Sequence, residues 1–295
     1  MGYEVIGSSR DHQINSFINL KKLNIIENVK LITLVPEIYD SVVIGLTENN
    51  PSVVFNLSGQ TSVGISFSIP IETINSIYIG TMNFLEAIRK NKPSIKYFNA
   101  GSSECYGDIG NTVADESTRF SPQSPYAIAK TSAHYLVKQY RQSYGLYACT
   151  GILFNHESNL RSRNFVTMKI ILAAKKIHSH NGGILNLGNL DIYRDWGWAP
   201  EYVVAMWRIM QQEIPDDFII ATGKTTSLKT FVEKAFSYYS LNWVNYVVED
   251  KRLFRPADIK YISGDPSKIN KNLGWKSTFS IDEIINALSI GVESA

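Results

Sequence analysis

The sequence has few of the residues and runs that mark a disulfide-rich or membrane protein. It contains only two cysteines, Cys105 and Cys149, which provide no disulfide framework and no metal-ligand spacing. No apolar run approaches the roughly 18 residues of a membrane-spanning helix, and nothing at the start resembles a signal peptide. The five histidines are scattered and predict no metal site. These absences predict free, reduced thiols, no membrane partner and a cytoplasmic location.

The chain also lacks an excess of positive or negative charge. The chain has 29 Lys and Arg against 27 Asp and Glu, and the resulting net charge of +2 is spread along its length. There is no basic block of the kind that marks a nucleic-acid-binding face, so we expect no nucleic-acid partner. The hydrophobic content of 44% supplies an ordinary globular core. A length of 295 residues is enough for one large or two ordinary domains.

A glycine-rich phosphate loop is the most informative absence. Neither G-x-G-x-x-G nor G-x-x-G-x-x-G occurs in the sequence. In dinucleotide-binding folds such a turn joins the first strand to a helix whose N-terminus holds the pyrophosphate. Residues 2–11 look instead like the second strand of such a fold and its end. We therefore expect a chain without that first strand and loop, and a sheet with one unpaired strand edge.

Strand-like and helix-like segments alternate along the first half of the chain. Strands are predicted at 53–57, 95–100 and 147–154. Helices are predicted from Asn75 as N-cap and from Ser124 as N-cap, the second with Pro125 at its first position and Gly145 as its stop. This alternation predicts an α/β fold with a doubly wound parallel sheet. Polar clusters follow successive strands, at the sheet edge where such folds bind ligands.

The alternation becomes less regular after about residue 159, where helices such as 227–239 mix with loops rich in Arg, Asp and Trp. We therefore expect a dinucleotide-binding domain over residues 1–158. A smaller, mixed α/β substrate-binding part would span residues 159–295. Residues from about 184 to 212 are expected to return to the first domain.

Three residues supply the parts for a reversible oxidation followed by an elimination. Tyr126 and Lys130 lie four positions apart in a predicted helix, so they share one helix face. A nearby ammonium favours the phenolate and would lower the pKa of the tyrosine from about 10. Glu104 lies upstream in Gly101-Ser-Ser-Glu-Cys-Tyr-Gly107. Taken alone, the pair is also compatible with a packed tyrosine and a solvated lysine, and Glu104 with a surface carboxylate.

Together these segments resemble the GDP-mannose 4,6-dehydratase family, which belongs to the extended short-chain dehydrogenase/reductase superfamily. The resemblance covers essentially the whole chain and is most specific in 56–64, 101–107, 124–130 and 151–158. It implies a Rossmann-like fold truncated at its N-terminus, NADP as cofactor and GDP-mannose as substrate. A homo-dimer or tetramer is also implied. Met168 and the segment 32–36, which lacks an Asp often found near the adenine, depart from the family pattern.

The resemblance also implies roles for individual residues. The catalytic residues that it implies are Ser102, Glu104, Tyr126 and Lys130. Cofactor contacts fall to Ser9, Arg10, Leu57, Ser58, Gly59, Gln60, Thr61, Lys130, His156 and Arg161. Contacts with the GDP moiety fall to Asn155, Lys169, Arg194 and Arg255. The implied reaction converts GDP-D-mannose to GDP-4-dehydro-6-deoxy-D-mannose with loss of water, as in deoxyhexose nucleotide-sugar biosynthesis such as that of GDP-fucose.

Two other functions remain open at this stage. One is a nucleotide-sugar epimerase or reductase of the same superfamily, although such enzymes seldom place a carboxylate at the position of Glu104. The other is a cofactor-deficient, non-catalytic GDP-sugar-binding relic. Three of the predicted site residues also have a structural alternative. His156 could be a core histidine, and Arg194 could form an ion pair with Asp195. Arg255 has the alternative of capping a neighbouring strand.

Overall fold

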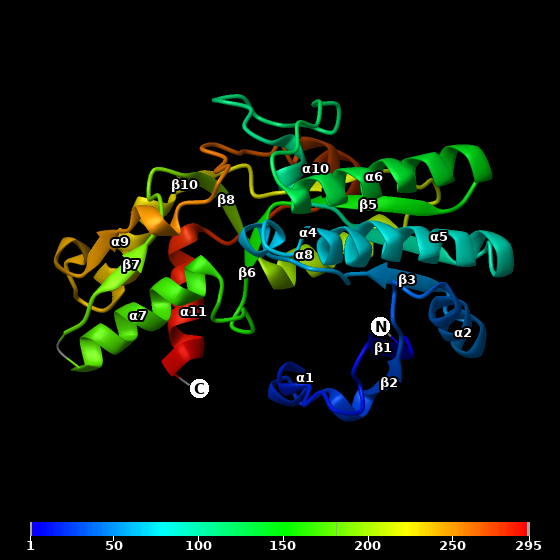
Figure 1. The fold of residues 1–295 in the computed structure, drawn as a ribbon, viewed down its shortest axis with the longest axis horizontal. Helices are drawn as coiled ribbons and strands as arrows, with labels where there is room; N and C mark the ends of the chain where they lie inside the picture. Colours follow the sequence, from blue (N-terminus) through cyan, green and yellow to red (C-terminus); the bar gives the residue numbers. More distant parts are fainter. Residues whose placement is uncertain (1, 181, 294–295) are drawn as a thin grey trace.

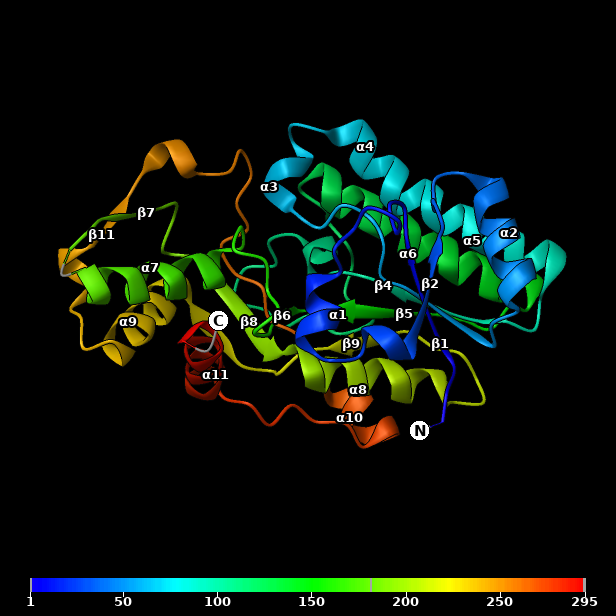
Figure 2. The same cartoon turned by 90° about the horizontal axis from the view of Figure 1, so that it is seen from below.

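The computed structural model describes residues 2–180 and 182–293. Its main sheet is parallel and has the strand order β3 (Val53–Asn56), β4 (Lys96–Ala100), β5 (Ala148–Leu153), β9 (Phe218–Ile220). Successive side chains of a strand point to opposite faces. Tyr97 accordingly packs with α5 (Gly80–Asn91) and α6 (Pro125–Tyr144), whereas Phe98 packs with α8 (Ala199–Met210). Helices thus cover both faces, as Figure 2 shows, and the predicted doubly wound sheet is confirmed.

The N-terminal unit forms a sheet of its own. β1 (Val5–Ser9) and β2 (Val29–Thr33) pair in parallel, with Val5 opposite Val29. The connection between them contains α1 (Ile18–Lys22), and α2 (Tyr39–Asn49) follows β2 and packs on α5. Within the described residues β1 pairs only with β2 and β3 only with β4, so each has an unpaired edge. Figure 1 shows this unit beside β3, at one side of the main sheet.

One predicted helix start is confirmed and another is wrong. The Ser124 hydroxyl accepts a hydrogen bond from the Ala127 N–H at 3.1 Å, and Gly145 ends α6 with φ 65°. Asn75 is not a cap, because it has helical dihedral angles inside a longer helical stretch. That stretch runs through α4 (Pro70–Ile74), a π-helical turn (Asn75–Ile79) and α5. Pro70 at the first helical position starts it, since its fixed φ suits a helix and its missing N–H costs nothing there.

The second part of the chain has a separate core. Its helices α7 (Val166–His180), α9 (Leu228–Tyr238) and α11 (Ile281–Glu293) pack around residues such as Ile171, Phe231 and Leu288. β7 (Leu185–Leu187) pairs with β11 (Val247–Glu249) in this part. A three-stranded sheet of β6 (Asn155–Glu157), β8 (Tyr193–Trp198) and β10 (Thr225–Ser227) lies next to it.

The residues that return to the main sheet are not the same as the expected range 184–212. α8 does pack on the main sheet, but β7 stays with β11, and β9 with α10 (Ser267–Leu273) returns as well. A short apolar strand such as 218–220 is hard to place from sequence, because its partner strand lies far away in the chain. Among the described residues, no helix is both long enough and apolar enough to cross a membrane.

Candidate active site

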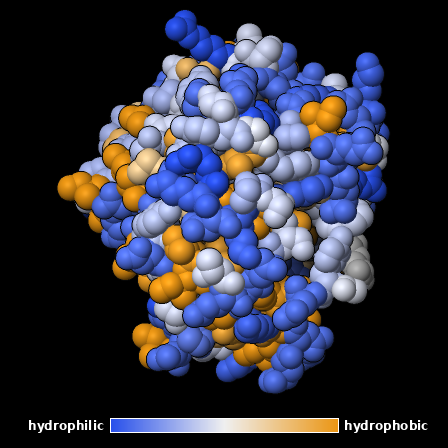
Figure 3. All heavy atoms as spheres, turned by 90° about the vertical axis from the view of Figure 1, so that its right-hand side faces the viewer, coloured by the Kyte–Doolittle hydropathy of each residue, from blue (hydrophilic) through white to orange (hydrophobic). Residues whose placement is uncertain are grey.

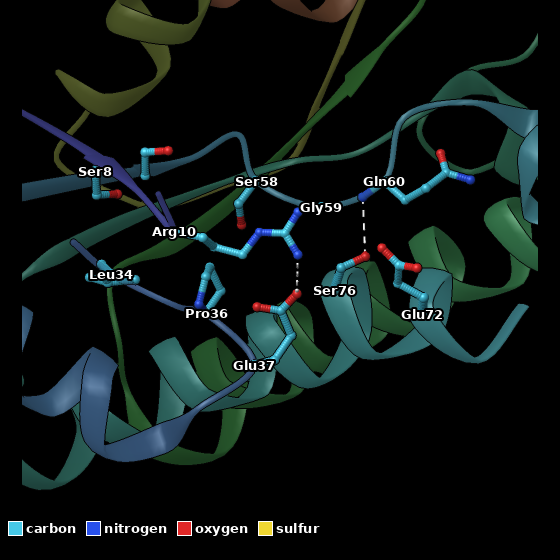
Figure 4. A pocket seen from close by; sticks show the side chains of 11 residues that line it. Ser8, Arg10, Leu34, Pro36, Glu37, Ser58, Gly59, Gln60, Glu72 and Ser76 are labelled. Carbon is cyan, nitrogen blue, oxygen red and sulfur yellow. Dashed lines mark hydrogen bonds and ion pairs between the residues drawn. The ribbon is translucent and has the colours of Figure 1, made fainter. Parts of the chain in front are cut away.

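Two hollows lie at the carboxyl ends of the parallel strands. The larger, of about 580 Å³, is walled by residues that follow β4 and β5, by the first turn of α6 and by segments of the second part. The smaller, of about 310 Å³, lies between the ends of β1 and β2 and the segment after β3 (Figure 4). Residues 57–61 contribute to both walls, so the two hollows adjoin along one stretch of backbone.

The four predicted catalytic residues line the larger cavity together. Ser102 follows β4 and caps a 3₁₀ turn (Ser103–Tyr106, η3), accepting the Glu104 N–H at 3.3 Å. Tyr126 and Lys130 lie one turn apart on the buried face of α6, each less than a tenth exposed. The Ser102 hydroxyl lies near the Tyr126 phenol and favours its charged form. A phenol, a hydroxyl, a carboxylate and an amine therefore surround one space.

Burial controls the protonation of the Tyr126 and Lys130 pair. It raises the pKa of Tyr126 above its usual value, against the opposing effect of the Ser102 hydroxyl. It lowers the pKa of Lys130 to about 8. The expected fall in the tyrosine pKa is therefore not met in this structure. The reason is burial of the phenol. The Lys130 ammonium donates instead to the Ala100 carbonyl at 2.7 Å and lies 5.8 Å from the Tyr126 ring centroid.

His156 lies on β6 and also faces this cavity. Its Nδ1 donates to the Phe154 carbonyl at 2.8 Å, and its ring stacks on Tyr202 with centroids 4.8 Å apart. Burial lowers the pKa of His156 to about 4, so the ring is neutral at physiological pH. It is thus a packed histidine, as the structural alternative required, and a cavity-lining residue as well.

Arg161 is held in place by two neighbours. Its Nε lies 3.2 Å from the Glu157 carboxylate, and its guanidinium lies 3.7 Å from the centroid of the Phe165 ring. Glu157 is almost completely buried, and burial raises the pKa of its carboxyl. The guanidinium is also a cation that opposes the rise in the Tyr126 pKa.

The predicted GDP ligands form a polar, largely cationic wall of the same cavity: Asn155, Lys169, Arg194 and Arg255. Arg194 is buried, donates to the Tyr193 carbonyl at 2.9 Å and lies 3.9 Å from the Asp258 carboxylate. The alternative pairing with Asp195 is not formed, because that carboxylate accepts the backbone N–H groups of Thr222 and Gly223. The Lys169 ammonium donates to the Asn186 carbonyl at 2.8 Å.

The smaller hollow contains the rest of the predicted cofactor residues. Ser9 and Arg10 lie at the end of β1, opposite Ser58, Gly59 and Gln60. Figure 4 shows the Arg10 side chain reaching across the pocket to a carboxylate that follows β2. The backbone N–H of Gln60 donates to a serine hydroxyl of the π-helical turn at 3.1 Å.

All the site residues predicted from sequence thus lie on one of the two hollows. Four lining carboxylates were missed: Glu37, Glu72, Glu157 and Asp258. Glu157 stands in the polar cluster that ends the 147–154 strand, which is a usable signal. Asp258 and Glu37 have no comparable signal, because their partners lie far away in the sequence. Across 2–180 and 182–293, no group of three His, Cys, Asp or Glu is arranged to hold a metal ion.

Comparison with solved structures defines the class of fold. The chain is similar to a dTDP-glucose 4,6-dehydratase from Bacillus anthracis in complex with NAD, at a TM-score of 0.85 and 18% identity over 99% of this chain and 89% of that one. It is also similar to RMD from Pseudomonas aeruginosa complexed with NADPH, at a TM-score of 0.81 and 19% identity over 99% and 100% of the two chains. The chain therefore shares the Rossmann-type fold of these two structures.

Sequence comparison identifies the family. Residues 1–288 match the family model for GDP-mannose 4,6 dehydratase. GDP-mannose 4,6 dehydratase 1 from Arabidopsis thaliana is 44% identical over 242 residues, which are 81% of this chain and 67% of that protein. The chain belongs to the GDP-mannose 4,6 dehydratase family.

A nicotinamide dinucleotide, which both solved structures named above contain, fits the residues present at both ends of the adjoining hollows. The larger cavity carries Tyr126 and Lys130, which suit a nicotinamide ribose. The smaller carries a guanidinium at Arg10 and, at Glu37, a buried carboxylate oxygen without a hydrogen-bond partner among the described residues. The other oxygen of this carboxylate faces Arg10 and is a charged acceptor for a ligand hydroxyl or amine.

Proposed function

We propose that this chain converts GDP-D-mannose to GDP-4-dehydro-6-deoxy-D-mannose with loss of water, as a lyase that uses a nicotinamide dinucleotide. The observation that carries the proposal is the convergence of Ser102, Glu104, Tyr126 and Lys130 on one cavity with a cationic wall. A phenol and an amine are enough for oxidation at C4. The added carboxylate of Glu104 supplies what elimination needs beyond oxidation.

The bound nicotinamide would supply a reversible hydride acceptor. Tyr126 accepts the proton of the sugar O4 hydroxyl as its phenolate, and the Ser102 hydroxyl and the Arg161 guanidinium both favour that charged form. Ser102 also orients the sugar hydroxyl. The resulting 4-ketone makes the C5 hydrogen acidic. Glu104 removes that proton and returns one to the C6 hydroxyl, which leaves as water. Return of the hydride to C6, with a proton to C5, would then complete the 6-deoxy product without net cofactor reduction. General acid–base groups of this type contribute about 10²- to 10⁴-fold each.

The remaining assignments follow from charge. Arg194 and Arg255 offer planar guanidinium groups suited to a diphosphate, with Asn155 and Lys169 beside them. Arg10 and Ser9 offer a guanidinium and a hydroxyl to a 2′-phosphate, so we propose NADP as the preferred cofactor. We further propose a cytoplasmic homo-dimer or tetramer, in keeping with the family resemblance.

A labelled substrate tests the reaction directly. GDP-mannose carrying deuterium at C4 should give a deoxysugar with deuterium at C6, with catalytic cofactor and no net cofactor reduction. Appearance of a 4-epimer would favour the epimerase alternative. Stoichiometric formation of reduced cofactor without a deoxysugar would refute the dehydratase proposal.

A further inference from the structure

The smaller hollow contains an ion pair that spans it. Arg10, just after β1, places its Nη1 3.6 Å from Oε1 of Glu37, which lies between β2 and α2. Figure 4 shows the two side chains meeting in the middle of the pocket. The Arg10 side chain is 61% exposed and that of Glu37 only 22%. The cation is therefore largely solvated, whereas the carboxylate is mostly buried in the wall.

The second oxygen of Glu37 has a different environment. Oε2 is buried and has no hydrogen-bond partner among the described residues. Because Oε2 is enclosed by protein, a ligand in the pocket reaches the carboxylate from the side of Oε1, and a hydroxyl or amine brought there gains a charged acceptor. A ligand that brings a phosphate to the same place meets a like charge and loses affinity.

We propose that Glu37 determines the discrimination between 2′-phosphorylated and unphosphorylated nicotinamide dinucleotides, by competing with the 2′-phosphate for Arg10. The proposal rests on the proposed function, in which Arg10 contacts that phosphate. A free ribose hydroxyl can donate to Glu37. A 2′-phosphate must instead displace the carboxylate from the guanidinium. Exposed pairs are weak, at about 0–1 kcal/mol, so Glu37 reduces the preference for NADP without abolishing it.

Binding measurements separate this role from catalysis. Calorimetry on the full chain with NADP⁺ and with NAD⁺ gives both dissociation constants without any turnover. Glu37→Gln should tighten NADP⁺ binding about two- to fivefold and leave NAD⁺ binding unchanged or weaker. Asp40→Asn is the matched control, since it removes the same charge three residues away and outside the pocket lining. It should leave the ratio of the two constants unchanged.

Arg10→Ala supplies a second variant at an exposed position. It should weaken NADP⁺ binding several-fold and leave NAD⁺ binding within about twofold. If Glu37→Gln left the ratio of the two dissociation constants unchanged, the inference about Glu37 would be wrong and the proposed function would stand. The same holds if Arg10→Ala weakened the binding of both cofactors equally. Failure of the unmutated chain to bind either cofactor would overturn the inference and the proposed cofactor use together. Normal discrimination without dehydration would refute only the proposed reaction.

Discussion

The strands beneath the large cavity and the strands beside the small pocket differ in how completely their residues are buried. In β4 and β5 every residue but Lys96 and Leu153 is buried, whereas β1 and β2 contain no buried residue. Apolar side chains form patches over the lower half of the face in Figure 3, on the side where Figure 1 places the N-terminal unit. The groups proposed for proton transfer therefore rest on a rigid, dry support. The groups proposed for the adenosine end of the cofactor rest on a loosely packed one.

This difference appears in the electrostatics. Burial shifts the pKa of Lys130 to about 8 and that of His156 to about 4, both in the large cavity. In the small pocket the Arg10 and Glu37 pair is partly solvated and salt can screen it. We conclude that substitutions in the cavity will change chemistry by orders of magnitude, and that substitutions in the pocket will only adjust affinity.

Tyr126→Phe should give the largest effect. It removes the only proposed proton acceptor for the sugar O4, so turnover should fall by roughly 10⁴-fold. Steady-state formation of the deoxysugar measures this loss. GDP binding, measured by calorimetry, should remain within about twofold, because the cationic wall is untouched. Retained turnover would show that the buried phenol is a packing residue.

Asp217→Asn should give the largest loss of stability. Asp217 accepts two hydrogen bonds from Arg141 of α6, at 2.6 and 2.9 Å, and the Thr150 N–H of β5 at 2.7 Å. Removing one partner of a buried pair costs about 3–5 kcal/mol. Denaturant unfolding measures this loss in the free energy of unfolding. Asp282→Asn, which breaks the exposed pair with Lys234, is the control and should cost at most about 1 kcal/mol. Similar losses in both variants would contradict the claimed rigidity of the main sheet.

Lys130 should make stability depend on pH. Its pKa in the folded chain is about 8 against a usual 10.5, so between these values the unfolded chain binds more protons and stability rises with pH. The rise should approach about 3 kcal/mol, because each pKa unit is worth about 1.4 kcal/mol. Lys130→Met should remove this slope in parallel denaturant titrations. Identical slopes in both proteins would mean that the amine is solvated.

Much of this cavity follows from sequence, because its residues come at predictable places in the fold. Apolar runs located three of the four strands of the main sheet, and Ser124 with Pro125 located the helix that carries Tyr126. The features that could not be predicted from the sequence depend on tertiary contacts. The helical stretch through Asn75 continues because of its packing, and the direction of the Tyr126 pKa shift follows from burial. The partner of Arg10 could not be identified either, since Glu37 meets it only in the folded chain.

Glu104→Gln should separate oxidation from elimination. Without a carboxylate the C5 proton stays in place, so deoxysugar formation should fall roughly 10²-fold or more. Oxidation at C4 should persist, and reduced cofactor should accumulate in a single turnover. Tyr126→Phe is the matched comparison, since it should block both. Near wild-type turnover in Glu104→Gln would make the carboxylate structural and would favour the epimerase or reductase alternative.

The smallest effect should distinguish the two regions most directly. Each amide of β4 and β5 lies within a sheet covered by helices on both faces, whereas β1 has one unpaired edge and partly exposed side chains throughout. Local opening needs less energy where few apolar contacts must break. Native-state hydrogen exchange should therefore show β1 and β2 amides at least about tenfold less protected than those of β4 and β5, which is about 1.4 kcal/mol. Equal protection would mean that the N-terminal unit unfolds together with the main sheet, and the small pocket would then be as rigid as the large cavity.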